Sequence, residues 1–467
     1  MSKRRTLKID WQQVDRWLIG EEWIGSLINT HISKLCRDIG PRWSGSAEEK
    51  MAVGYVIEQF SSSGLLDPRI EEFELNTWEH GPDEASIVES GHNPVIQPLL
   101  NCPAVNISGR IVNVGHGMEN QLKAAGPLLK EAIAVLDLEY EPFSVPSPLP
   151  ERLRALSKTG ASAAIVIEGK SGGRLEYRHA TDKRWNNVAG TVLPHPIPTV
   201  LTSREDGAIL RVSEGNSLNL KVQGKSYKTT GYNTVVDLKG NMESEESILV
   251  GAHHDTVLNS PGGNDNASGT AVVLECSRLL GILSQELDVR PGCNIRFVTW
   301  GAEEQNHQGS AAYIRRHHGP EPIPRFVINL DELATGPIKG VVLQFPHLRP
   351  LVQSTLDSMG DGLRCYVLDH VDPSADSFSF ARAAIPTAIL WRWRFVGRHP
   401  DSDYHHEPGD TADKVRTKEL REYAWQLARL LLRLSHVTEA DWPTSPLKID
   451  EIETRIRQET GAVGRTM

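Results

Sequence analysis

The sequence predicts an α/β fold, built on a mixed and largely parallel sheet with helices on both faces and interrupted by an inserted β-rich domain. Two observations lead to this prediction. From residue 232 onward, strand-like apolar segments alternate with loops and helical segments, which is typical of an α/β domain. Between residues 78 and 228 the pattern changes to short β-like runs separated by loops rich in glycine, proline and serine.

Length and composition limit the number of domains and the kinds of partner that the chain can have. A chain of 467 residues can form one large domain and a smaller one. Its apolar fraction of 39% and charged fraction of 24% are those of an ordinary soluble globular protein. A net charge of −10, from 60 acidic and 50 basic residues without a basic block, argues against nucleic acid or an anionic membrane as a partner. We also find no run that we expect to span a bilayer.

The first residues and the cysteines favour a cytoplasmic location. The opening MSKRRTLKIDWQQVDRW is basic but has no apolar stretch behind it, so we expect no secretory signal. The cysteines are odd in number, widely scattered and never spaced as CxxC, which is typical of reduced, mostly buried thiols. These are Cys36, Cys102, Cys276, Cys293 and Cys365.

Four domain segments follow from a pass along the chain. Residues 1–77 are the amino-terminal part of the main domain, with helical segments over 11–63 interrupted at GPRWSGS (40–46) and then a strand. Residues 78–228 are the β-rich insertion, with one helix expected near 150–158. Residues 229–440 complete the main domain, with strands at 233–240, 247–255, 294–304, 325–332 and 385–393 and helices at 267–283 and 417–434. Residues 441–467 are a peripheral helix or a tail.

Three apolar strands of the main domain end on acidic residues or histidine. SILVGA leads into His253 and Asp255, NIRFVTWGA into Glu303 and Glu304, and RFVINL into Asp331. Ligands of open α/β sheets bind beyond the carboxyl ends of the strands. Any one of these motifs alone is typical of a solvated strand end. Their joint occurrence indicates a functional site.

The loop PGGNDNASG (261–269) adds Asp265 just before a long apolar helix. In the structural interpretation this is an ordinary helix start, capped by Asn266 or Ser268. In the functional interpretation Asp265 bridges two cations, while the glycines let the backbone fold tightly. A last segment, DYHHEPGDT (403–411), places His406 four residues before Asp410, with His405 as a neighbouring competitor.

Taken in order, these motifs resemble the co-catalytic zinc metallopeptidases that include bacterial aminopeptidases, plasma glutamate carboxypeptidase and glutamate carboxypeptidase II. The matching motifs are His253-x-Asp255, Asn264-Asp265-Asn266-Ala-Ser-Gly, Glu303-Glu304, Asp331 at a strand end and His406-x-x-x-Asp410. GPRWSGS and the following helix resemble the family's amino-terminal segment. The insertion looks like a protease-associated domain. The resemblance extends over roughly residues 20–435.

The resemblance implies a site with two Zn²⁺ ions per chain. His253 and Asp331 would bind one ion, Glu304 and His406 the other, and Asp265 would bridge them. Nitrogen and oxygen ligands in this mixture suit zinc, and Co²⁺ or Mn²⁺ could substitute.

The remaining motif residues receive supporting roles from the resemblance. Glu303 would act as general base on a metal-bridging water and pass the proton to the leaving amine. Asp255 would accept a hydrogen bond from His253, and Asp410 would do so from His406.

Three positions depart from the family's pattern. QNHQ (305–308) stands where the family has a glycine and apolar residues, so that His307 is either a substrate contact or a loop histidine. The family's Ser-Asp-His segment reads Ala375-Asp376-Ser377, in which Asp376 is a further candidate substrate contact. Glu332 follows Asp331 where smaller residues are commoner.

The substrate is predicted only as a small peptide or amide. Arg392, Arg394 and Arg398 follow a strand that leads toward His406, and they would either bind a substrate carboxylate or form a solvated face. The first alternative favours a carboxypeptidase or dipeptidase. An aminopeptidase would hold a free amine with the acids of the metal site. We expect an aminopeptidase or dipeptidase, with a carboxypeptidase as the alternative, and a homodimer if the insertion exposes apolar surface.

Three other functions compete with this prediction. A glutaminyl-cyclase-like acyltransferase shares the fold and much of the metal site but normally lacks the insertion. A non-catalytic binding protein would not be expected to keep the five ligands and Glu303. A non-peptide amidase remains an open alternative.

Overall fold

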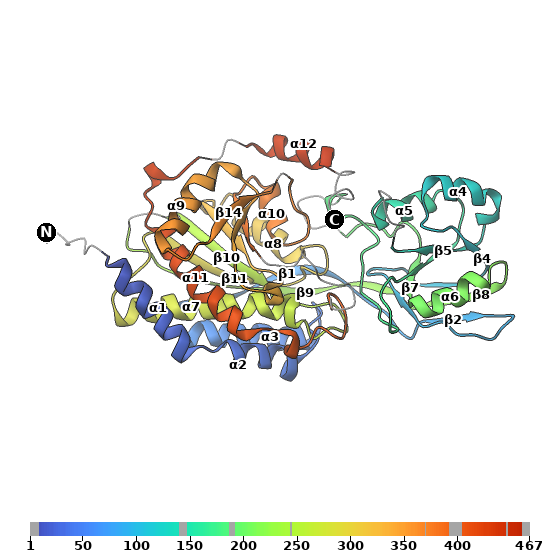
Figure 1. The fold of residues 1–467 in the computed structure, drawn as a ribbon, viewed down its shortest axis with the longest axis horizontal. Coiled ribbons are helices and arrows are strands. Elements are labelled where there is room, and N and C mark those ends of the chain that lie inside the picture. Colours follow the sequence, from blue (N-terminus) through green and yellow to red (C-terminus); the bar gives the residue numbers. More distant parts are fainter. Residues whose placement is uncertain are drawn as a thin grey trace. The chain divides into compact units, whose positions relative to one another are not determined.

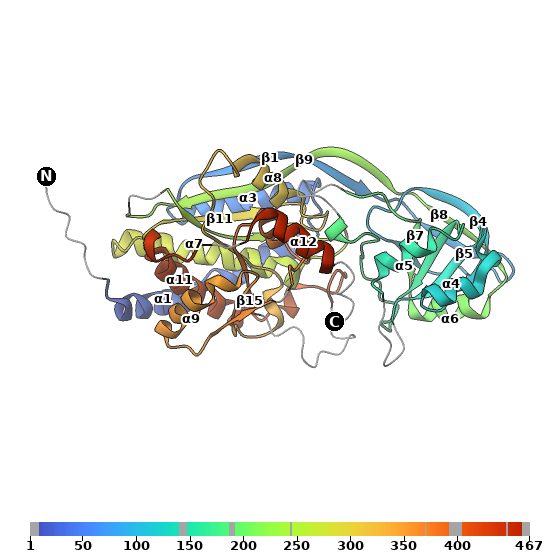
Figure 2. The same cartoon turned by 90° about the horizontal axis from the view of Figure 1, so that it is seen from above.

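A computed structural model describes residues 9–139, 147–185, 192–242, 245–368, 370–391, 404–444 and 447–459 of the chain (Figures 1 and 2). The chain divides into two compact units. The main unit comprises Met1–Phe73, Thr230–Val396 and Asp410–Glu453, and the inserted unit comprises Glu74–Thr229, Gly397–Gly409 and Thr454–Met467. We had assigned the whole of residues 229–440 to one domain, whereas the segment that contains His406 groups with the inserted unit.

The main unit is built on a mixed sheet of eight strands, as predicted. Its spatial order is β1 (Leu66–Glu79), β9 (Lys225–Leu238), β11 (Asn294–Trp300), β10 (Ser247–His253), β12 (Phe326–Asn329), β15 (Thr387–Trp391), β13 (Gly340–Leu343) and β14 (Arg364–Val367). Strands β11, β10, β12 and β15 are parallel neighbours, while β9 and β13 pair with them antiparallel. The carboxyl ends of the central strands therefore meet at one edge of the sheet.

Helices cover both faces of this sheet. One face packs against α1 (Trp11–Gly25), α2 (Ile28–Ser33), α3 (Ala47–Ser62), α7 (Ser268–Glu286) and α11 (Thr417–Ser435), which lie together in Figure 1. The other face packs against α8 (Gln308–His317) and α10 (Ser377–Arg382), and α9 (Arg349–Met359) lies against β13 and β14. Alternation along β10 explains the two layers, because Ile248 and Val250 belong to the larger core and Leu249 to the smaller one.

Helix α7 corrects one expectation about membranes. Residues Gly263–Glu286 are long and apolar enough, by length and composition alone, to span a bilayer, which we had not expected of any segment. However, 89% of the most apolar window is buried inside the protein. This burial is typical of the core helix of a globular unit.

The inserted unit contains a second sheet and more helix than the sequence predicted. The seven strands are ordered β2 (Glu84–Ile87), β8 (Ser217–Val222), β4 (Val105–Asn113), β5 (Ile133–Asp137), β6 (Ala163–Ile167), β7 (Thr199–Thr202) and β3 (Ile96–Pro98). The expected helix is α5 (Leu149–Leu156), but α4 (Glu119–Ala125) and α6 (Arg204–Val212) were not predicted.

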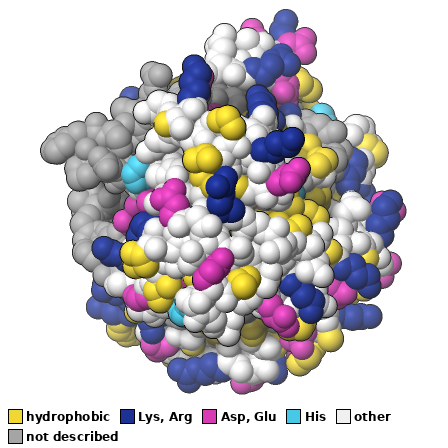
Figure 3. All heavy atoms as spheres, turned by 90° about the vertical axis from the view of Figure 1, so that its right-hand side faces the viewer, with side chains coloured by type: hydrophobic (Ala, Val, Ile, Leu, Met, Phe, Trp, Pro, Cys, Tyr) yellow, Lys and Arg dark blue, Asp and Glu magenta, His cyan; other side chains and the backbone are white. Residues whose placement is uncertain are grey.

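The surface of the inserted unit bears isolated apolar side chains. Val88, Val95, Leu128 and Val212 are exposed, and the face in Figure 3 shows hydrophobic side chains interspersed with both signs of charge. Scattered apolar residues are normal for a protein surface, and the expected homodimer stays a prediction.

The helix near the carboxyl end and the burial of the cysteines agree with the expectations from the sequence. Helix α12 (Ile449–Glu459) is the expected peripheral helix near the carboxyl end. All five cysteines are buried, as expected from the sequence.

Candidate metal centre

Three side chains of the main unit converge at the carboxyl edge of the sheet. His253 ends β10, Asp331 follows β12, and Asp265 lies in the loop before α7. The Nε2 atom of His253 is 3.1 Å from Oδ1 of Asp265 and 3.4 Å from Oδ1 of Asp331. One donor atom from each lies within 4.8 Å of the other two, so the three side chains could hold a metal ion.

Asp255 connects the ends of β10 and β11. Its two carboxylate oxygens accept the backbone N–H groups of Glu303, at 3.2 Å, and Glu304, at 3.3 Å. Its Oδ1 also lies 3.3 Å from Nδ1 of His253, on the side of the ring opposite Nε2. This buried carboxylate therefore orients one predicted ligand and positions the backbone of another.

Asn266 joins the loop of Asp265 to the loop of Asp331. Its Oδ1 accepts the N–H groups of Gly269 at 2.9 Å and Glu332 at 3.3 Å, and its Nδ2 donates to the carbonyl of Leu330 at 2.8 Å. From the sequence, Asn266 was a candidate helix cap and part of the family motif, with no role between the loops assigned to it. In the structure it fixes the spacing between the two acidic loops.

Asp410 has a different partner from the one we expected. Its carboxylate accepts the backbone N–H groups of Asn264 and Asp265, at 2.8 and 2.9 Å. The acceptor beside Nδ1 of His406 is the carbonyl oxygen of Tyr177, at 2.8 Å. Burial raises the pKa of Asp410 to about 7, although the two amides act in the opposite direction.

Arg42, which sequence reasoning passed over, is a fully buried cation beneath these loops. Its guanidinium donates to the carbonyls of His254 at 2.8 Å and Pro261 at 2.8 Å, and its backbone N–H donates to Thr256 Oγ1 at 2.7 Å. It therefore ties the loop after β10 to the glycine-rich loop. The only hint in the sequence was the position of Arg42 within the loop GPRWSGS. Charged side chains are rarely buried, so its burial could not be predicted from the sequence.

The charges around His253 fit a bound cation. Burial by itself would lower the pKa of His253, but the charge of Asp331 and contacts with Asp255 and Asp265 raise it well above its usual value. Buried carboxylates in this number require a compensating positive charge. Imidazole and carboxylate donors in this arrangement are a ligand set that suits zinc.

The two neighbouring glutamates, Glu303 and Glu304, are buried at the end of β11. Oε1 of Glu303 lies 2.8 Å from Nε2 of His307. Asp376 is fully buried, and burial followed by the negative charge of Glu303 raises its pKa well above the usual range. Asp376 and His307, which lie in two of the three departures from the family's pattern, therefore belong to the surroundings of the predicted base.

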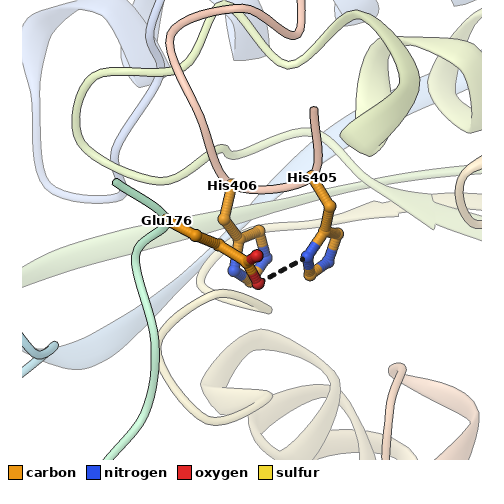
Figure 4. Close-up of side chains that lie close together, drawn as sticks. All are labelled: Glu176, His405 and His406. Carbon is orange, nitrogen blue, oxygen red and sulfur yellow. Dashed lines mark hydrogen bonds and ion pairs between the residues drawn. The ribbon is translucent and has the colours of Figure 1, made fainter. Parts of the chain in front are cut away.

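His406 lies in the inserted unit, where the backbone around Tyr177 holds it. Besides the contact between Nδ1 and the Tyr177 carbonyl, the Tyr177 N–H donates to the carbonyl of His406 at 3.1 Å. An Nδ1–H donor of this kind leaves Nε2 as the ring atom that can bind a metal. Figure 4 shows His405 stacked beside His406, with Nδ1 of His405 3.3 Å from Glu176.

Buried ion pairs hold the rest of this segment. Glu407 accepts from Lys170 at 2.5 Å and from Arg174 at 2.6 Å, while Arg174 also packs over the ring of Tyr404. Lys170 makes a second ion pair with Glu176 at 2.9 Å. Residues 404–409 are therefore anchored to residues 170–177 of the same unit.

The predicted substrate arginines Arg392, Arg394 and Arg398 lie outside the described residues. Glu332, another departure, accepts from Asn264 Nδ2 at 3.2 Å. Its carboxylate supports the metal loop.

The sequence of the main unit is similar to that of known peptidases. Residues 233–431 match the sequence model of peptidase family M28. Aminopeptidase YwaD of Bacillus subtilis (strain 168) is 25% identical over 408 residues, which cover 84% of this chain and 80% of that protein. Carboxypeptidase Q of Mus musculus is 26% identical over 427 residues, covering 85% and 82%.

Solved structures share the fold. A peptidase M28 precursor from Shewanella amazonensis has a TM-score of 0.72 at 22% identity, covering 94% of this chain and 99% of that one. A zinc aminopeptidase from Bacillus subtilis has a TM-score of 0.70 at 21% identity, covering 90% and 98%. The family match covers the strands and loops on which the buried acids and histidine lie. Residues 233–431 therefore resemble peptidase family M28, and the chain is a metallopeptidase, a hydrolase.

Proposed function

We propose that this metallopeptidase is a zinc-dependent exopeptidase that uses two ions and hydrolyses a terminal peptide bond. The observation that carries the proposal is the convergence of His253, Asp265 and Asp331 at the carboxyl edge of the sheet. By resemblance, Glu304 and His406 would complete the ligand set together with Asp265. The tautomer that Tyr177 imposes on His406 supports this assignment.

The chain's own groups would move the protons. Bound zinc lowers the pKa of water and stabilises negative charge on the scissile carbonyl oxygen. Glu303 takes a proton from the attacking water and passes it to the leaving amine nitrogen. Asp255 holds the Glu303 backbone, so the base is aligned with the strand end that carries His253.

The free amine of an aminopeptidase or dipeptidase substrate would interact with the acids of the metal site. One relative is named an aminopeptidase and another a carboxypeptidase, so substrates of both kinds have to be tested. The carboxypeptidase alternative would use Arg392, Arg394 or Arg398 to bind the substrate carboxylate. A panel of dipeptides, peptides blocked at either end, aminoacyl anilides and non-peptide amides separates these substrate classes.

Replacing either of the two adjacent glutamates tests the mechanism. Glu303→Gln keeps the size of the side chain but removes the base, so kcat on the best panel substrate should fall on the order of 10²- to 10⁴-fold while both metals stay bound. Glu304→Gln is the matched comparison, and it should lose metal together with activity. Near-normal turnover by Glu303→Gln would show that another group is the base.

A further inference from the structure

His307 is a second buried group beside the proposed base, and it stands in the QNHQ segment that departs from the family's pattern. We propose that His307 is a positioning residue, which holds one carboxylate oxygen of Glu303 so that the other oxygen faces the reacting water. This inference rests on the proposed role of Glu303 as general base. It assigns His307 no contact with substrate.

The backbone of residues 302–307 turns sharply, so that His307 lies beside Glu303. Ala302, Asn306 and His307 all have left-handed conformations, with φ of 56°, 69° and 57°. Such conformations cost non-glycine residues about 1–3 kcal/mol each and persist only where the surroundings impose them. The His307 N–H donates to the Glu303 carbonyl at 3.0 Å and closes the turn. The imidazole consequently lies 2.8 Å from the carboxylate of Glu303.

Packing holds the imidazole ring in this position. His307 is buried, and its ring meets Phe378 edge-on, with centroids 6.1 Å apart. Phe378 belongs to α10, which is tied to α8 by a hydrogen bond of 3.0 Å between Ser379 and Ser310. Because α8 begins directly after His307, the backbone of His307 is fixed by α8 while Phe378 packs against its ring. The donor is therefore in place before substrate arrives.

A fixed donor has a specific effect on a carboxylate base. A proton on Nε2 of His307 would donate to Oε1 of Glu303 and restrict rotation of the carboxylate group. Loss of the donor would leave the base present but misaligned, and a misplacement of about 1 Å can cost on the order of 10²-fold in rate. A histidine that only fills the core would affect stability without this effect on rate.

The test compares His307→Ala, which removes the donor, with His307→Gln, which keeps a side-chain N–H. His318→Ala is the matched control, because His318 is exposed at the other end of the same helix. Each full-length variant is assayed for kcat and KM on the best substrate of the panel, for metal content and for melting temperature. His307→Ala is also made in the Glu303→Gln background.

We expect His307→Ala to lower kcat about 10- to 100-fold, with KM and metal content nearly unchanged and with most of kcat restored in His307→Gln. In the Glu303→Gln background the alanine change should lower kcat no further, because the two residues act as one unit. Unchanged kcat in His307→Ala, or a glutamine variant as slow as the alanine variant, would overturn the inference. If Glu303→Gln itself stayed active, the proposed base would be wrong instead.

Discussion

Glu22 is a buried acid in α1, remote in sequence from the metal loops. Its side chain is only 1% exposed, and burial together with the negative charge of Glu275 raises its pKa to about 9. The negative charge of Glu275 is compensated, because its carboxylate accepts the Leu27 N–H at 3.0 Å and an N–H of Arg278 at 2.7 Å. At neutral pH, Glu22 is therefore the protonated member of the pair.

This pKa shift predicts a pH-dependent stability. The folded protein keeps Glu22 protonated up to pH 9, whereas the unfolded chain ionises it above its ordinary value of 4.5. The contribution of Glu22 to stability is thus fully present below pH 4.5 and is lost as the pH rises toward 9. Glu22→Gln removes this loss, so the variant should gain on the order of 1–3 kcal/mol over the parent at pH 8 and little at pH 5.

Urea unfolding of the metal-loaded parent and of Glu22→Gln at both pH values measures this difference. Equal gains at pH 5 and pH 8 would contradict the account of Glu22. Glu21→Gln serves as a control, since Glu21 lies on the same helix but is half-buried and paired with Arg278.

At the residue scale, the convergence of polar side chains at the strand ends could be predicted from the sequence, whereas the contacts that support these side chains could not. His253, Asp265 and Asp331 could be found because each follows a recognisable strand or loop. The contacts of Arg42 could not be predicted, because its guanidinium donates to backbone carbonyl groups, which every residue has. The same holds for the Tyr177 carbonyl beside His406, which leaves no signature in the sequence.

Helix α7 lies so close to the strand end before Asp331 that its second residue must be small. A Cβ added at Gly269 would lie 2.3 Å from the carbonyl oxygen of Leu330. We predict that Gly269→Ala pushes the Asp331 loop away and lowers both metal affinity and melting temperature. Gly54→Ala in α3 is the control, because open space surrounds that position and the change should stabilise the helix by up to about 1 kcal/mol. Gly269→Ala with parental metal affinity would contradict the prediction.

The segment 404–409 offers a second prediction at this scale. Glu407→Gln removes the carboxylate that binds both Lys170 and Arg174, which should loosen the loop that carries His406. Changes in such supporting contacts typically cost 10- to 100-fold in metal affinity, so zinc titration should show weakened binding of one ion. Glu74→Gln, which breaks an exposed pair with Lys228, is the control. Equal zinc affinity in both variants would argue against the positioning role.

Elements with a long apolar pattern were predictable, and short ones were not. Helices α7 and α11 and strands β10, β11 and β12 were all expected near their observed bounds. Helix α10 has only six residues, and β14 alternates exposed and buried positions over four. Elements of this length are determined by their neighbours rather than by their own periodicity.

At the scale of the whole chain, the two-unit organisation could be predicted because the pattern of strand-like, helical and loop segments changes along the sequence. Membership of residues 404–409 in the inserted unit was not, because it depends on ion pairs between residues more than 230 positions apart. The protease-associated character of the insertion and the cytoplasmic location remain proposals.

The central claim is that two ions act together in this chain, and elemental analysis of the purified full-length protein tests it most directly. The account predicts close to two equivalents of zinc per chain, loss of metal and activity together on chelation, and recovery of both when zinc is restored. Co²⁺ or Mn²⁺ should also restore some activity. A stable content of one equivalent with full activity, and no gain on adding zinc, would contradict the two-ion mechanism and favour a cyclase-like enzyme.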